Sequence, residues 1–128
     1  MALIVADSDV LIDALRGREP SLTRVTEGLD TGTLATTTVT VFELLSGVRS
    51  DREREPVQRL LAPLTILPFD ESAAGAAATA RRHLERQGAQ IGMGDLLIAG
   101  ICLSRSASLL TRNRAHFERV PGLSLVAD

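Results

Sequence analysis

Three carboxylates that are far apart in the sequence each lie where an apolar element begins or ends. Asp7 follows the apolar run 3–6, Glu43 lies about one turn into an apolar helical pattern, and Asp95 precedes the apolar stretch 96–103. Carboxylates that share one pocket repel one another and favour protonation unless a cation joins them. Because carboxylate oxygens suit Mg²⁺ or Mn²⁺, convergence of the three acids would predict a divalent-metal site.

Each acid taken alone has a structural interpretation that we favour for that acid in isolation. Asp7 fits a turn, Thr40 and Glu43 match a capping box, and Asp95 fits a helix N-cap. Helix-terminal acids are common, so only their convergence would indicate chemistry.

Histidine and cysteine usage does not favour zinc. The chain has one cysteine, Cys102, and two separated histidines, which offer no zinc-ligand spacing. His83 is predicted to lie on a solvated helix face, and His116 is interpreted as a structural residue in a turn.

The elements that would position the acids alternate between strand and helix patterns. Strands are expected at 3–6, 34–37, 64–69, 107–111 and 123–126, and helices at 10–16, 21–29, 38–47, 52–61, 71–87 and 95–103. This alternation predicts a single α/β domain over residues 1–128. Its central parallel sheet of about five strands would have helices on both faces, in three layers.

A parallel sheet brings the carboxyl ends of its strands to one edge. Asp7, the residues after Thr37 and the segment 111–113 would therefore lie along that edge, which is where open α/β folds place their ligands. Ser8 or Asp9 is expected to cap the first helix.

Composition limits the class of protein. The net charge is −2, and all 14 basic residues are arginines, so bulk electrostatic attraction to nucleic acid is not indicated. A single cysteine excludes an internal disulfide, and no apolar run is long enough to span a bilayer. No signal peptide is evident, and we expect a cytoplasmic protein.

Four motifs in order carry a resemblance to a known family. They are the strand leading into residues 7–12 (DSDVLI), residues 38–47 (TVTVFELLSG), residues 94–99 (GDLLIA), and residues 110–113 (LTRN) followed by Phe117 and 120–123 (VPGL). Together they span almost the whole chain. They resemble the PIN-domain ribonucleases and, more narrowly, the VapC-type toxins of bacterial toxin–antitoxin pairs.

The resemblance implies roles for particular residues. Asp7, Glu43 and Asp95 would form an acidic pocket for Mg²⁺, or for Mn²⁺ in its place, with Asp7 and Asp95 as the surest ligands. The family's fourth acid maps onto Asn113, which brings no charge, so Asn113 is expected to orient other groups and the number of metal ions stays open. Three residues would lie beside the metal or contact substrate: Ser8, Thr111 and Arg112.

The implied activity is endonucleolytic cleavage of RNA by metal-activated water, with arginines gripping phosphate. Arg112 and Arg114 are the candidates near the active edge. The resemblance also implies a homodimer and a small VapB-like antitoxin, whose tail can place a basic side chain in the acidic pocket.

Two other functions remain open from the sequence. Residues 7–11 also fit the nucleophile motif of haloacid-dehalogenase-like phosphatases, with Asp7 as the nucleophile. That family normally needs a lysine, which this chain lacks, and a second acid where Ala99 stands. The other alternative is a catalytically weak PIN fold that acts as a binding module.

Overall fold

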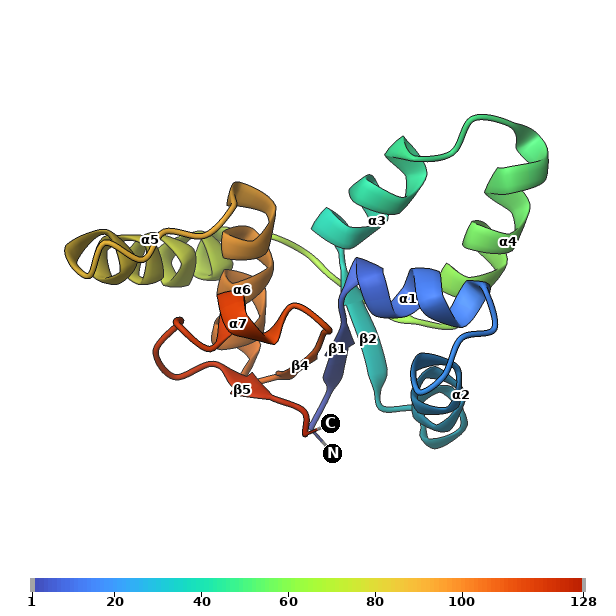
Figure 1. Cartoon of the computed structure of the whole chain (residues 1–128), viewed down its shortest axis with the longest axis horizontal. Helices are drawn as coiled ribbons and strands as arrows, with labels where there is room; N and C mark the ends of the chain where they lie inside the picture. Colours follow the sequence, from blue (N-terminus) through green and yellow to red (C-terminus); the bar gives the residue numbers. More distant parts are fainter. Residues whose placement is uncertain (1, 128) are drawn as a thin grey trace.

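The computed structural model describes residues 2–127, which form a five-stranded sheet with helices on both faces (Figure 1). The strands are β1 (Ile4–Ala6), β2 (Leu34–Thr37), β3 (Thr65–Leu67), β4 (Ser108–Leu110) and β5 (Ser124–Leu125). The helices are α1 (Ser8–Leu15), α2 (Ser21–Thr31), α3 (Thr38–Ser46), α4 (Asp51–Leu61), α5 (Glu71–Arg86), α6 (Met93–Arg105) and α7 (Arg114–Phe117). The predicted α/β class is confirmed.

The strand order is β3-β2-β1-β4-β5, and every neighbouring pair is parallel. From β1 the chain builds outward through β2 and β3 on one side, and later through β4 and β5 on the other. The order therefore reverses between β1 and β4. In open α/β sheets, ligands bind outside the carboxyl ends of the strands at such a switch point. Asp7 and Thr111 follow these two strands directly.

Side chains that alternate along the strands divide the core into two halves. Val5 belongs to the cluster built with α5 and α6, whereas Ala6 belongs to the cluster built with α1, α2 and α4, and both residues are fully buried. Figure 1 shows the same division, with α5, α6 and α7 on one side of β1 and β2 and the other helices on the opposite side. The sheet is therefore packed against helices on both faces.

Helices α5 and α6 pack at very close range. A Cβ on Gly100 would lie 2.6 Å from the backbone oxygen of Ala73 and 2.7 Å from the Cβ of Ala77. Both alanines are buried, so the small residues of α5 serve this helix–helix contact. The contact fixes α6, whose first turn carries Asp95.

Two predicted helix caps are wrong. Asp7 itself caps α1 by accepting from the Ser8 backbone N–H, so neither Ser8 nor Asp9 is the cap. Helix α3 begins at Thr38, and Thr37 caps it by accepting from the Thr40 backbone N–H at 3.0 Å. The capping box is therefore absent, because Thr40 already lies inside the helix.

Some strand limits also differ from the predicted ones. Strand β3 is shorter than 64–69 because Pro68, which has no N–H to donate to a sheet, follows its last residue.

Across residues 2–127, no helix is both long and apolar enough to cross a membrane.

Candidate metal centre

Asp7 is a buried carboxylate at the carboxyl end of β1, with only 5% of its surface exposed. Its Oδ1 accepts from the Ser8 backbone N–H and its Oδ2 from the Thr111 hydroxyl, both at 2.8 Å. Burial raises the pKa of Asp7 to about 6; the charges of Asp9 and Asp95 add to this, and the two hydrogen bonds oppose it. Asp7 is thus held firmly in a place where its charge needs compensation.

Asp95 reaches the same edge from α6. It lies in the first turn of that helix and is not the N-cap, because the helix begins at Met93 and Gly92 occupies the cap position. Oδ2 of Asp95 accepts from the Asn113 side-chain amide at 3.2 Å. The charge of Asp95 contributes to the raised pKa of Asp7, and both residues line one hollow, so the structure supports the predicted convergence of these two acids.

The loop after β4 links the two carboxylates. The Thr111 hydroxyl donates to Asp7, its oxygen accepts from the Asn113 backbone N–H at 3.0 Å, and the Asn113 amide continues to Asp95. The backbone N–H of Arg112 donates to Oδ2 of Asp9 at 3.1 Å. The loop 111–113 therefore fixes Asp7 and Asp9 at the start of α1 and Asp95 in α6.

Glu43 approaches from α3. A Cβ on Gly94 would lie 3.1 Å from Oε2 of Glu43, so the glycine leaves room for the carboxylate beside the start of α6. Burial and then the charge of Asp95 raise the pKa of Glu43, and the nearby Ser8 hydroxyl opposes this shift. Glu43 therefore lies in the electrostatic field of Asp95.

An open hollow of about 450 Å³ lies over these groups. It is lined by Asp7, Ser8, Asp9, Asp95, Arg112 and Asn113. Of the other predicted site residues, Thr111 is buried beside Asp7, and Glu43 is not among the residues that line the hollow. Within residues 2–127, no three acidic, histidine or cysteine side chains are grouped closely enough to enclose a metal ion by themselves.

The residues that line the hollow nevertheless fit a hard divalent cation. Oδ1 of Asp9 is buried and has no hydrogen-bond partner within the described chain, and Asp7 is buried beside two like charges. The side chains that line the hollow with Asp7 offer carboxylate, hydroxyl and amide oxygens as ligand atoms, which Mg²⁺ prefers. Mg²⁺ commonly uses one or two carboxylates and keeps several waters, so a partial protein cage suits it.

His116 is a site residue that the sequence interpretation missed. Its Nδ1 lies 3.3 Å from Oδ2 of Asp95 and 2.8 Å from Nδ2 of Asn113. Residues 114–117 were expected to be a turn, whereas they form α7 and place His116 close to the Asn113 side chain. The spacing of three between Asn113 and His116 was the available signal.

The two candidate arginines differ in their surroundings. Nε of Arg112 lies 3.0 Å from Oδ2 of Asp13, a buried acid of α1, and the arginine side chain remains 61% exposed at the hollow. Arg114 instead donates through Nη1 to the carbonyl oxygen of Val126 at 2.6 Å and lies near Glu118. Arg114 therefore anchors the C-terminal segment, and the structure does not support its predicted role in gripping phosphate.

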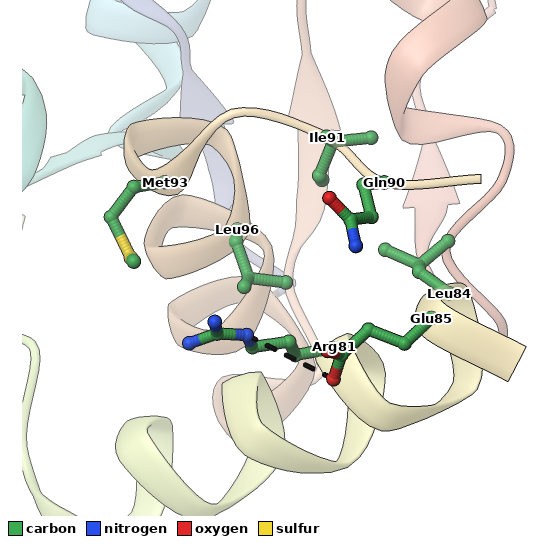
Figure 2. Close-up of a pocket in the computed structure, with 7 residues that line it drawn as sticks. All are labelled: Arg81, Leu84, Glu85, Gln90, Ile91, Met93 and Leu96. Carbon is green, nitrogen blue, oxygen red and sulfur yellow. Dashed lines mark ion pairs between the residues drawn. The ribbon is translucent and has the colours of Figure 1, made fainter. Parts of the chain in front are cut away.

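A second, smaller hollow lies on another side of α6 (Figure 2). Arg81 and Glu85 from α5 form an ion pair at 3.9 Å along its wall, and Leu96 lines it from α6. Leu96 and its neighbour Asp95 thus line different hollows. Among the described residues that line the smaller hollow, Glu85 is the only acid, and it is already paired with Arg81, so this hollow is a poor cation site.

Comparisons with known proteins agree with this arrangement. Residues 4–123 match the PIN domain family. The chain is 37% identical over 115 residues to Ribonuclease VapC10 of Mycobacterium tuberculosis, covering 90% of this chain and 86% of that relative. It is 29% identical over 127 residues to the tRNA(fMet)-specific endonuclease VapC of Shigella flexneri, covering 96% of each.

Solved structures show the same fold. The DNA-bound VapBC complex of Salmonella typhimurium contains a chain that matches with a TM-score of 0.88 and 28% identity, covering 98% of both chains. VapBC2 of Rickettsia felis, bound to a promoter DNA fragment, matches with a TM-score of 0.87 and 22% identity, covering 97% of both.

The chain therefore belongs to the PIN-domain family and, within it, to the VapC-type ribonucleases. This confirms the resemblance carried by the four sequence motifs and the expectation that the protein is an enzyme. The haloacid-dehalogenase alternative is not supported, because the family match spans nearly the whole chain and Asp7 is buried with a hydrogen bond to each oxygen.

Proposed function

We propose that this chain is the toxin of a toxin–antitoxin pair and acts as a Mg²⁺-dependent endoribonuclease, with Mn²⁺ able to replace Mg²⁺. The observation that supports this most strongly is the approach of Asp7 and Asp95 at the switch point of the sheet, joined through Thr111 and Asn113. A firmly held pair of acids beside an open hollow suits a cation and an extended substrate.

Asp7 and Asp95 would hold the metal ion. When bound, the ion polarises a phosphodiester oxygen and lowers the pKa of a water molecule toward neutrality. Ser8 donates one hydrogen bond to Oδ1 of Asp7, and Thr111 donates one to Oδ2. Each oxygen therefore keeps a second lone pair that can bind the metal ion. Both hydrogen bonds also fix the orientation of the carboxylate.

Glu43 would orient the attacking water and accept its proton at a carboxylate oxygen. Its raised pKa makes it a stronger base than a free glutamate, which favours this role. Water attack on phosphorus breaks the bond to one ribose oxygen, so the products carry a phosphate monoester and a hydroxyl. No 2′,3′-cyclic phosphate forms, since the ribose 2′-hydroxyl is not the nucleophile.

Arg112 would contact the RNA backbone at the rim of the hollow. Its Nε is held by Asp13, which orients the guanidinium and leaves the terminal nitrogens for phosphate. The chain carries a net charge of −2, so its overall charge does not attract RNA. Binding of the RNA phosphates would therefore depend on a few arginines at defined positions.

The partner that we propose is a VapB-like antitoxin that inserts a cationic side chain among the acids in place of metal and RNA. The VapBC names of the structural relatives support an antitoxin partner. We also propose that the free toxin is a homodimer and acts in the cytoplasm. Two large apolar side chains are exposed, Phe42 on α3 at 70% and Met93 at the start of α6 at 58%, and they support a protein interface on this part of the molecule.

Induced expression of the chain without its antitoxin tests the proposal. We expect growth arrest and accumulation of RNA fragments at defined sites, both abolished by Asp7→Asn. The mapped fragment ends should lack 2′,3′-cyclic phosphate. Normal growth with intact RNA from the soluble, folded protein would favour a binding module instead.

A further inference from the structure

His116, Asn113 and Asp95 form a close triangle at the edge of the proposed metal site. Nδ2 of Asn113 lies 2.8 Å from Nδ1 of His116 and 3.2 Å from Oδ2 of Asp95, and the latter two atoms are 3.3 Å apart. The shortest side of the triangle joins the amide to the imidazole. These distances suit one NH₂ group that donates to two acceptors.

The positions of the protons follow from these distances. If the Asn113 amide were reversed, its oxygen would face the Asp95 carboxylate and repel it. With Nδ2 in place, a proton on Nδ1 of His116 would meet the amide donor at the shorter of its two contacts, which is 2.8 Å to Asn113 against 3.3 Å to Asp95. The arrangement without such a conflict has Nδ1 of His116 as an acceptor and its proton on Nε2.

Asn113 gives up a local hydrogen bond to make these contacts. It occupies the N-cap position of α7, where asparagine usually accepts from a backbone N–H, yet its side chain makes no such bond. The amide instead reaches Asp95, 18 residues earlier in the chain. Because the Asn113 side chain bonds Asp95 and does not cap α7, we infer that its orientation matters for the position of the Asp95 carboxylate.

We propose that His116 is a positioning residue of the metal site: its Nδ1 holds the Asn113 amide, and that amide in turn holds the Asp95 carboxylate. Oδ2 of Asp95 is then occupied, and Oδ1 remains for a cation. This inference rests on the proposed function, since it assigns a task to residues around the same acids. Partners of ligating carboxylates typically affect metal affinity by about 10- to 100-fold.

Mn²⁺ binding to the purified full chain, measured by electron paramagnetic resonance in the absence of RNA, tests the role of His116. We expect His116→Ala to weaken Mn²⁺ affinity about tenfold. In His116→Asn the side-chain oxygen takes the place of Nδ1 and restores affinity to within about threefold of the unmodified protein. In His116→Gln the oxygen corresponds to Nε2, so affinity should stay low.

His83→Ala is the matched control, because it removes the other histidine from α5 and should leave affinity unchanged. Unfolding temperatures of all variants with EDTA would identify loss of folding as a cause. Unchanged Mn²⁺ affinity in His116→Ala, or equal losses in His116→Asn and His116→Ala, would overturn the inference alone. Absence of Mn²⁺ binding by the unmodified protein would contradict the proposed function itself.

Discussion

Asp7 combines burial with like-charged neighbours, and this makes the metal-free protein sensitive to pH. The pKa of this carboxyl rises from 3.8 to about 6, so between these values the folded state binds more protons than the unfolded state. Stability then falls as pH rises through this window and levels off above it. At neutral pH the charged form costs roughly 3 kcal/mol relative to a pH well below 3.8, where the carboxyl is protonated in both states.

We therefore expect the metal-free protein to have a higher Tm at pH 5 than at pH 7, measured by calorimetry with EDTA present. Asp7→Asn should remove most of this difference, and added MgCl₂ should restore Tm at pH 7 in the unmodified protein. A Tm that rises from pH 5 to pH 7, or an identical profile in the variant, would contradict the assignment of Asp7 as a strained buried acid.

Thr111 supplies the second residue-scale prediction. Its hydroxyl donates to Asp7 and accepts from the Asn113 N–H, so Thr111→Val breaks both links while keeping the shape of the side chain. We expect Mn²⁺ affinity to fall by about tenfold and stability by about 1–3 kcal/mol. Thr111→Ser keeps the hydroxyl and should stay close to the unmodified protein in both measurements. Equal behaviour of the two variants would show that the hydroxyl is unimportant.

At the scale of elements, the contact between α5 and α6 sets the position of Asp95. Gly100→Ala would force a Cβ to within 2.6 Å of the Ala73 backbone oxygen, which cannot move independently of its helix. We expect a loss of about 2–3 kcal/mol in the free energy of unfolding, measured with urea.

Gly75→Ala on α5 is the matched control, because a Cβ there meets nothing within 4 Å. It should stabilise the protein by about 0.5–1 kcal/mol, as alanine favours the helix. A Gly100→Ala variant as stable as this control would mean that the two helices can separate without cost.

The elements also show what sequence patterns could predict. The apolar runs in the sequence were sufficient to predict that the five strands exist and that a buried helix follows Asp95. They were insufficient for the ends of the elements, because α6 starts at Met93, where Gly92 rather than an acid provides the cap. The sequence alone did not predict the link from His116 through Asn113 to Asp95, since it depends on how α7 and α6 meet in space.

At the scale of the whole molecule, the exposed apolar side chains of Phe42 and Met93 predict self-association. We expect sedimentation of the free toxin to show a dimer, and Phe42→Asp to shift it to monomer because a charge would be buried at the interface. Leu22→Asp on α2, where the leucine is 38% exposed, is the control and should leave the dimer intact. A monomeric unmodified protein would contradict the proposed homodimer.

The most direct test of the account is the initial rate of RNA cleavage by the purified chain, without antitoxin, as Mg²⁺ is titrated. We predict a rate that saturates with Mg²⁺ and vanishes with EDTA. Asp95→Asn should lower it by at least about a hundredfold, and Asp30→Asn, an exposed acid of α2, should leave it unchanged. Cleavage that persists in EDTA, or full activity of Asp95→Asn, would contradict the claim that Asp7 and Asp95 hold a catalytic cation.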